Sequence, residues 1–283
     1  MLTDYHVHLR PDEEGTEAER FFTRENAERY RAAARERGIE ELGVSEHLHR
    51  FRQSLEVWEH PFWRENACDD LDAYCEWVRT ETDLRLGIEA DFVPGREAEM
   101  AALLDAREWD YVLGSVHFLR DAAIDMRGDW DVWRSSDPDA VWERYFQTLG
   151  EAARSGMFDV LSHPDLVKVW GGAAPRPRRE PRVYYEMAME GIAESDVAIE
   201  VSTAGLRKPT GEIYPAPDLL DMCVEAGRPV ALSSDAHVPE HIGYGYEQAL
   251  ELLGSRGIEE IAVFEGRKRR MEPVGHPADA GHR

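Results

Sequence analysis

Short apolar segments alternate with amphipathic ones along almost the whole chain, which predicts a regular succession of strands and helices. The seven apolar segments predicted to be strands are Leu2–His8, Leu42–His47, Leu84–Phe92, Tyr111–Phe118, Asp159–His163, Val197–Ser202 and Val230–Ser234. The helices predicted between them are Arg24–Arg37, Asp70–Thr82, Glu97–Ala106, Ala140–Ser155, Arg182–Ser195 and Ala216–Ala226. Three of these helices are followed directly by glycine, a common helix terminator because it tolerates the left-handed conformation.

This alternation predicts an α/β fold built on a parallel sheet. The first four strands are almost continuously apolar, as expected when helices cover both faces of a sheet. No low-complexity linker interrupts the middle of the chain, so we expect one domain over residues 1–272. Ile261–Phe264 could add an eighth strand. The polar, Gly- and Pro-rich residues 273–283 are predicted to form a flexible tail.

Composition indicates which classes of partner are unfavourable and in which cellular compartment the protein works. The formal net charge is −24 among 283 residues, and such a surface repels nucleic acid and anionic membranes. No apolar run is long enough to span a bilayer, and the N-terminus does not resemble a signal peptide. The three cysteines, Cys68, Cys75 and Cys223, form no CxxC pattern. These features predict a cytoplasmic protein without a disulfide framework.

Histidines and carboxylates are concentrated where the predicted strands end. The first strand ends in His6 and His8, and the second ends in His47. Equivalent positions in or after later strands hold Glu89, His117, His163, Asp235 and His237. In a parallel barrel the carboxyl ends of all strands open on one face, so these residues should converge although they span positions 6 to 237.

Their spacing and chemistry predict a metal centre. Residues two apart on a strand point to the same side, so the pair His6 and His8, and the pair Asp235 and His237, can each face one ion. Imidazole and carboxylate ligands suit zinc, manganese or iron. One histidine at a strand end would normally be a packing residue, but the repeated pattern favours ligation because buried carboxylates need partners.

At this level of detail the chain resembles the PHP (polymerase and histidinol phosphatase) metallohydrolases, and within them the histidinol-phosphatase branch. The resemblance runs through the whole chain, in the motifs DYHVH, SEH, GIEADF, YVLGSVHF, SHPDL, STAGLRKP, EIYPAP and SSDAH. It implies a distorted (β/α)7 barrel, similar to a TIM barrel, that holds two or three divalent ions at the carboxyl ends of its strands.

The resemblance also implies how the ligands are shared. His6, His8, Glu89 and Asp235 would hold one ion, and Glu89 would bridge to a second ion held by His117 and His163. His47 and His237 would hold a third. Many relatives supply a further histidine shortly after the HxH motif, where this chain has Leu9–Gly15. Asp12 is our choice of replacement; Glu13, Glu14 and a weak or empty third site remain alternatives.

The expected activity is hydrolysis of a phosphate monoester, most specifically L-histidinol phosphate in histidine biosynthesis. Glu89, Asp235 and His237 would act through the ions and not as nucleophiles. The basic residues Arg207 and Lys168 match positions in the family motifs and are predicted, with His241, to contact the substrate. Asp4 is predicted to orient His6 or His8. No protein general acid is assigned, although Asp91 is a weak candidate.

Several alternatives remain open. The same site would serve a PHP-type enzyme acting on another small phosphate ester or a nucleotide, because only the loops would differ. A non-catalytic metal-binding domain is a more remote alternative. A serine hydrolase is disfavoured because no serine has a base and an orienting acid in a recognisable pattern. An amidohydrolase would present a metal-bridging lysine or a differently placed aspartate.

Overall fold

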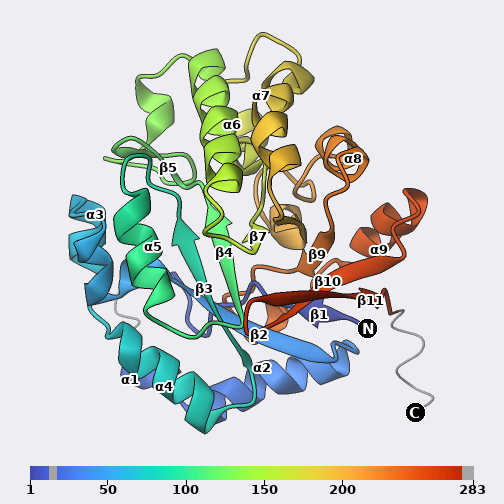
Figure 1. Cartoon of the computed structure of the whole chain (residues 1–283). Helices are drawn as coiled ribbons and strands as arrows, with labels where there is room; N and C mark the ends of the chain where they lie inside the picture. Colours follow the sequence, from blue (N-terminus) through green and yellow to red (C-terminus); the bar gives the residue numbers. More distant parts are fainter. Residues whose placement is uncertain (13–17, 276–283) are drawn as a thin grey trace.

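A computed structural model describes residues 1–12 and 18–275 and shows a nearly closed barrel of parallel strands surrounded by helices (Figure 1). The strand order follows the chain: β1 (Thr3–Asp4), β2 (Glu41–His47), β3 (Arg85–Asp91), β4 (Tyr111–Ser115), β7 (Val160–Leu161), β8 (Ala198–Ser202) and β9 (Val230–Ser233). Every neighbouring pair in this sheet is parallel. The prediction of a seven-stranded α/β barrel is confirmed.

The barrel closes just beyond its two terminal strands. Val7 and Ala236 form an isolated parallel bridge. The His8 N–H donates to the Ala236 carbonyl at 2.7 Å, and the Ala236 N–H donates to the His6 carbonyl at 3.1 Å. These hydrogen bonds join the segment after β1 to the segment after β9. The first and last predicted ligand pairs are thereby brought side by side, although more than two hundred residues separate them.

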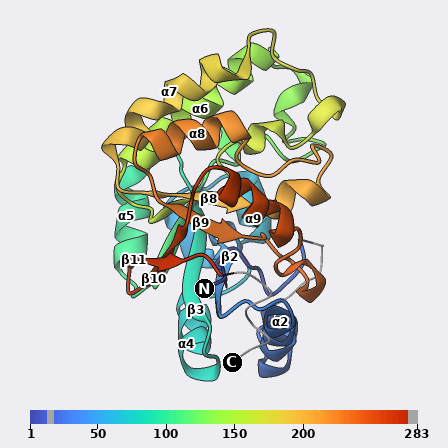
Figure 2. The ribbon, with the colours of Figure 1, turned by 90° about the vertical axis from the view of Figure 1, so that its right-hand side faces the viewer.

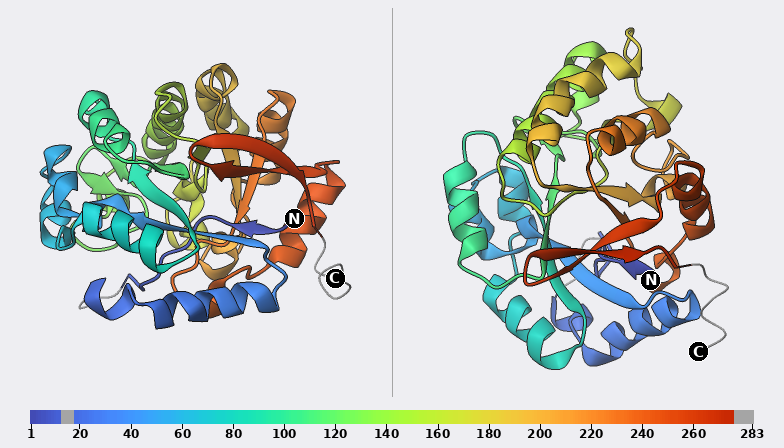
Figure 3. Two further views of the ribbon diagram at one scale, coloured as in Figure 1. Left: turned by 60° about the horizontal axis from the view of Figure 1, so that its bottom comes forward. Right: turned by 45° about the vertical axis from the view of Figure 1, so that its right-hand side comes forward.

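Helices cover the outside of the barrel, and their arrangement is clearest in the turned views (Figures 2 and 3). They are α1 (Ala18–Phe21), α2 (Arg24–Glu36), α3 (Pro61–Asn66), α4 (Leu71–Glu81), α5 (Glu97–Asp105), α6 (Pro138–Arg154), α7 (Pro181–Glu194), α8 (Pro217–Glu225) and α9 (Tyr246–Ser255). The six predicted helices are present, with ends shifted by one or two residues. Helices α1, α3 and α9 were not predicted; α9 follows the glycines Gly243 and Gly245, which favour a turn.

A tyrosine fills the barrel beside two glycines. The Tyr111 ring is fully buried, and a Cβ added at Gly43 or Gly87 would lie 2.3 Å from its atoms. Its hydroxyl donates to the Tyr5 carbonyl at 2.6 Å. Neighbouring strands therefore carry glycine opposite the aromatic ring because no larger side chain fits, as close packing of the interior requires.

The predicted eighth strand exists but does not join the barrel. Residues Glu260–Glu265 form β10, which pairs in an antiparallel hairpin with β11 (Lys268–Pro273). Phe264 lies against Tyr5, and Arg85 at the start of β3 pairs with Glu265. The hairpin thus covers the amino-terminal end of the barrel, and Figure 3 shows it crossing there. The opposite end remains for the candidate site.

The first three residues of the predicted tail belong to the fold. Pro273 belongs to β11, the Val274 N–H donates to Glu259, and the Gly275 N–H donates to Met1. These three residues are part of the fold because their backbone groups are paired. The rest of the predicted tail lies outside the described residues, so the domain boundary remains a prediction. No helix in the described part of the chain is long and apolar enough to cross a membrane.

Candidate metal centre

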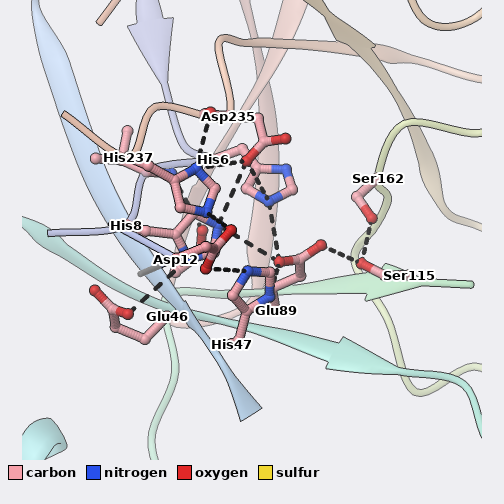
Figure 4. A network of polar contacts seen from close by, with 12 residues as sticks. His6, His8, Asp12, Glu46, His47, Glu89, Ser115, Ser162, Asp235 and His237 are labelled. Carbon is pink, nitrogen blue, oxygen red and sulfur yellow. Dashed lines mark hydrogen bonds and ion pairs between the residues drawn. The ribbon is translucent and has the colours of Figure 1, made fainter. Parts of the chain in front are cut away.

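Glu89 is the central residue of the site. Its carboxylate is buried at 2% exposure, and five histidines from four other parts of the barrel surround it, three of which, His6, His8 and His47, are labelled in Figure 4. Oε2 lies 3.2 Å from His6 Nε2, 3.5 Å from His8 Nε2 and 2.6 Å from His47 Nδ1. Oε1 lies 3.4 Å from His117 Nε2 and 3.1 Å from His163 Nε2. The two oxygens therefore face two different groups of imidazoles.

Asp235 completes the first of these groups. Its Oδ1 lies 3.6 Å from His6 Nε2, 3.5 Å from His8 Nε2 and 3.5 Å from His237 Nδ1. The barrel closure described above positions it, because Asp235 directly precedes the bridging Ala236. The structure therefore brings together all eight of the high-priority ligands predicted from sequence.

Asp12 occupies the place expected of a third-site ligand. Its Oδ2 lies 2.8 Å from His237 Nε2, and its Oδ1 lies 3.6 Å from His47 Nε2. Arg50 donates a hydrogen bond to the same carboxylate. The alternatives Glu13 and Glu14 lie outside the described residues.

Among the described residues, three sets of donor atoms lie close enough together to hold an ion. They are His6, His8 and Asp235; His6, Glu89 and His163; and His8, His47 and His237. The first contains three of the four residues of the predicted first site and lacks Glu89. The second contains His6 where His117 was expected, and the third adds His8. His6 and His8 each belong to two of these sets, as expected of a centre in which several ions lie close together.

Buried polar atoms at the centre fit metal ligation. His6 Nε2, His8 Nε2, Glu89 Oε2 and Asp235 Oδ1 face one another at ion-pair distances, but none of them makes a hydrogen bond among the described residues. Leaving such atoms unpaired is costly, and cations coordinated by them would remove that cost. The nitrogen and oxygen donors suit zinc, manganese or iron. The buried donor atoms and their chemistry therefore both fit the divalent metal ions that the fold implies.

Burial and the neighbouring charged groups both shift the pKa values of residues in the cluster. Burial raises the pKa of Glu89, but His6, His47 and His117 outweigh it and hold that pKa well below its ordinary value. Burial, helped by His237 and His47, lowers the pKa of His8 well below its ordinary value. His8 is therefore a neutral imidazole, the form that binds metal ions.

Two of the clustered residues have unusual backbones. His163 has φ of 25° and Asp235 has φ of 52°. Positive φ is unfavourable for residues with a Cβ and is retained mainly where function or packing demands it. Here it turns each side chain into the cluster directly after a strand.

Two further carboxylates hydrogen-bond to histidines of the cluster, and a third lies near His8 without a hydrogen bond to it. Glu200 on β8 accepts from His6 Nδ1 at 2.9 Å and from the His163 N–H at 2.6 Å. Asp91 on β3 contacts His117 Nδ1 at 2.8 Å. Glu46 on β2 lies 4.0 Å from His8 Nδ1 and accepts from Arg50 at 2.7 Å. Carboxylates behind ligating imidazoles fix the ring and its tautomer.

These contacts correct two predictions. Asp4 does not contact either imidazole: it accepts hydrogen bonds from the Ser234 N–H at 2.9 Å and from the Gly243 N–H at 3.1 Å, and so holds the backbone beside Asp235. Glu200 takes the role that was assigned to Asp4. Its only signal in the sequence is a carboxylate inside an apolar strand. Asp91 holds His117 and is therefore a poor candidate for a general acid.

Arg207 lies at the rim of the cluster. One guanidinium nitrogen, Nη2, donates to the Ser234 and Asp235 carbonyls at 2.8 and 2.9 Å. The other, Nη1, is buried and has no hydrogen-bond partner in the described part of the chain. The half-buried His241 is close enough for Arg207 and His237, together with the larger effect of burial, to lower its pKa.

Lys168 does not join this group. Its ammonium pairs with Asp165 at 2.9 Å and Glu212 at 3.2 Å, and it donates to the Ile213 carbonyl at 2.9 Å. All three of its donors are therefore used within the protein. We correct the predicted substrate role of Lys168 to a structural one, in which it ties the segment after β7 to the segment after β8.

Comparisons with known proteins identify the family of this chain. The family model of the PHP domain matches residues 22–204. A probable histidinol-phosphatase of Deinococcus radiodurans is 33% identical over 251 residues, which cover 86% of this chain and 91% of that protein. A histidinol-phosphatase of Lactococcus lactis is 21% identical over 193 residues, 68% of this chain and 70% of that protein. The chain therefore belongs to the PHP domain family.

Solved structures show the same fold. The crystal structure of histidinol phosphate phosphatase from Lactococcus lactis, complexed with zinc, L-histidinol and phosphate, aligns with a TM-score of 0.68 at 18% identity, covering 95% of this chain and 98% of that one. A putative histidinol phosphatase from Listeria monocytogenes aligns with the same TM-score and identity, over 87% of this chain and 99% of that one.

Proposed function

We propose that this protein is a metal-dependent phosphomonoesterase that hydrolyses L-histidinol phosphate to L-histidinol and phosphate. The observation that carries the proposal is the buried cluster around Glu89, with an arginine nitrogen left unpaired at its rim. The relative that is 33% identical over most of both chains is named a probable histidinol-phosphatase, and this name supports the choice of substrate.

The cluster would hold two or three divalent ions. His6, His8 and Asp235 would bind one, and His163 and His117 would bind a second, with Glu89 between the two. His47, His237 and Asp12 would complete a third. When bound, such ions supply Lewis acidity and a water of lowered pKa for hydrolysis. Zinc, manganese and iron all suit these ligands.

The chain's own residues would orient the ester and the ligands. Arg207 Nη1 is available for a phosphate oxygen while Nη2 remains fixed by the two carbonyls. A guanidinium fixed in this way binds phosphate with little loss of side-chain entropy. Glu200 and Asp91 would keep the imidazoles of His6 and His117 turned toward the ions. His241, beside Arg207, remains a candidate for substrate contact.

Substrate selectivity tests the proposed reaction. The metal-loaded protein should release phosphate from L-histidinol phosphate with kcat/KM about a hundredfold or more above that for p-nitrophenyl phosphate, because binding energy from the rest of the substrate contributes to catalysis. Phosphate release from a panel of phosphorylated metabolites and nucleotides measures this. Faster turnover of another ester would favour a different PHP-type phosphatase, and no hydrolysis with any of the three metals would indicate a non-catalytic domain.

Asp12 provides a separate test of the third ion. Asp12→Ala should lower the metal content by about one ion per chain, because His47 and His237 would lose the carboxylate between them. Asp12→His, which restores an imidazole of the kind found in many relatives, should retain that ion. Metal analysis after dialysis against metal-free buffer measures both. Equal metal content in wild type and Asp12→Ala would remove Asp12 from the ligand set.

A further inference from the structure

A carboxylate outside all the family motifs lies beside His117. After β4 the chain makes the short hairpin of β5 (Phe118–Leu119) and β6 (Ala122–Ala123) and returns to the site. The Ile124 N–H donates to the His117 carbonyl at 2.9 Å, and Asp125 is the next residue. Its Oδ1 is buried and makes no hydrogen bond within residues 1–12 and 18–275.

Two tryptophans fix the position of this carboxylate. The indole N–H groups of Trp133 and Trp170 both donate to the Ile124 carbonyl at 2.9 Å. Because that carbonyl belongs to the peptide bond that leads into Asp125, the backbone at Asp125 is held from two directions. The unpaired oxygen therefore belongs to a built part of the site and not to a loosely held loop.

The surroundings of Asp125 place it on the β4–β7 side of the cluster. The hydrogen bond from the Ile124 N–H to the His117 carbonyl fixes the backbone of Asp125 beside the segment that follows β4. Burial raises the pKa of Tyr214, and several carboxylates that include Asp125 raise it further. The Tyr214 ring lies 6.3 Å from that of His163, and its buried hydroxyl also has no hydrogen-bond partner among the described residues.

We infer that Asp125 determines substrate specificity by binding the positively charged amino group of an amino-alcohol phosphate. This inference rests on the proposed function. A buried carboxylate oxygen without a partner is costly, and an ammonium group would satisfy it. Arg207 reaches the cluster from the β8–β9 side and Asp125 from the β4 side. The two opposite charges therefore suit the two ends of a substrate that carries both phosphate and amine.

Asp125→Asn tests the inference with two esters. For L-histidinol phosphate, KM should rise about 10- to 100-fold while kcat changes far less, since a hydrogen bond to a charged group is lost. For p-nitrophenyl phosphate, which has no cation, KM should stay within about twofold. Inhibition by L-histidinol should weaken by a similar factor, whereas inhibition by inorganic phosphate should not change.

Two control variants make the result specific. Asp129→Asn removes the same charge from a 95% exposed side chain in the same loop and should leave both KM values unchanged. Asp125→Glu retains the charge and should retain most of the discrimination; it also serves if Asp125→Asn fails to fold. Equal changes for both esters, or no change for L-histidinol phosphate, would overturn the inference.

The proposed function and this inference can fail separately. If the wild type does not prefer L-histidinol phosphate, the proposed function fails. The role of Asp125 is then tested by comparing KM for 2-aminoethyl phosphate with KM for ethyl phosphate, because the two esters differ by the amino group. A rise in KM confined to the amino ester in Asp125→Asn supports the inference, and equal behaviour of the two esters refutes it.

Discussion

Replacing Glu89 with glutamine should lower kcat/KM for L-histidinol phosphate by about a thousandfold or more. The two carboxylate oxygens face separate groups of imidazoles, with distances of 2.6 to 3.5 Å. Glutamine has one oxygen and an NH2 group, so it can ligate on one side only and presents donors to the other. The variant should also bind fewer ions. Phosphate release and metal analysis of the same preparation measure the two effects.

A matched variant separates this effect from general loss of charge. Glu76→Gln on α4 removes one carboxylate from an exposed position and should retain full activity and metal content. Comparable thermal stability of the two metal-loaded variants would exclude global unfolding as the cause. If Glu89→Gln hydrolysed the ester at a near-normal rate, Glu89 could not be the bridging ligand.

Arg207→Ala should lower kcat/KM by about a hundredfold, because a charge-assisted contact to phosphate is lost. Arg207→Lys should recover only part of this activity, since a point charge cannot hold the Ser234 and Asp235 carbonyls and the phosphate in the same geometry. Inhibition by inorganic phosphate should weaken in both variants. Steady-state kinetics and phosphate inhibition constants provide the measurement.

The metal content of Arg207→Ala decides how its loss of activity is interpreted. Arg207 also holds the backbone beside Asp235, so an effect through the ions is the competing explanation. Unchanged metal content together with weaker phosphate inhibition supports direct contact with phosphate. Loss of metal with unchanged phosphate inhibition would assign Arg207 a purely structural role. Lys208→Ala, at the adjacent exposed position, should behave like the wild type.

The clustering of these histidines and carboxylates could be predicted from sequence because they follow a simple geometric rule. Each stands in or directly after a strand, and parallel strands in a barrel open at one end. The period of two paired His6 with His8 and Asp235 with His237, and Glu89 was singled out by its position in the third predicted strand. The prediction needed only the strand positions, and small errors in the strand ends did not affect it.

The supporting residues could not be predicted in this way. Glu200 orients His6 from the next-to-last strand, whereas Asp4, two residues from His6, faces Ser234 and Gly243 instead. Proximity in sequence therefore selected the wrong carboxylate. Lys168 matched a family motif, yet Asp165 and Glu212 occupy its ammonium. Such pairings depend on which side chains meet across strands, and no local pattern records this.

By itself, the sequence determined the alternation of strands and helices, the positions of the seven strands that form the barrel, and the histidines and carboxylates that stand at their carboxyl ends. Hydrophobic periodicity can be read within each segment, and parallel strands in a barrel all point in the same direction. These two facts were sufficient to predict the features just named. Only the tertiary structure decided the exclusion of β10 from the barrel, the division of imidazoles between the two oxygens of Glu89, and the unpaired Asp125. Those features depend on contacts between distant segments, which form only when the barrel closes.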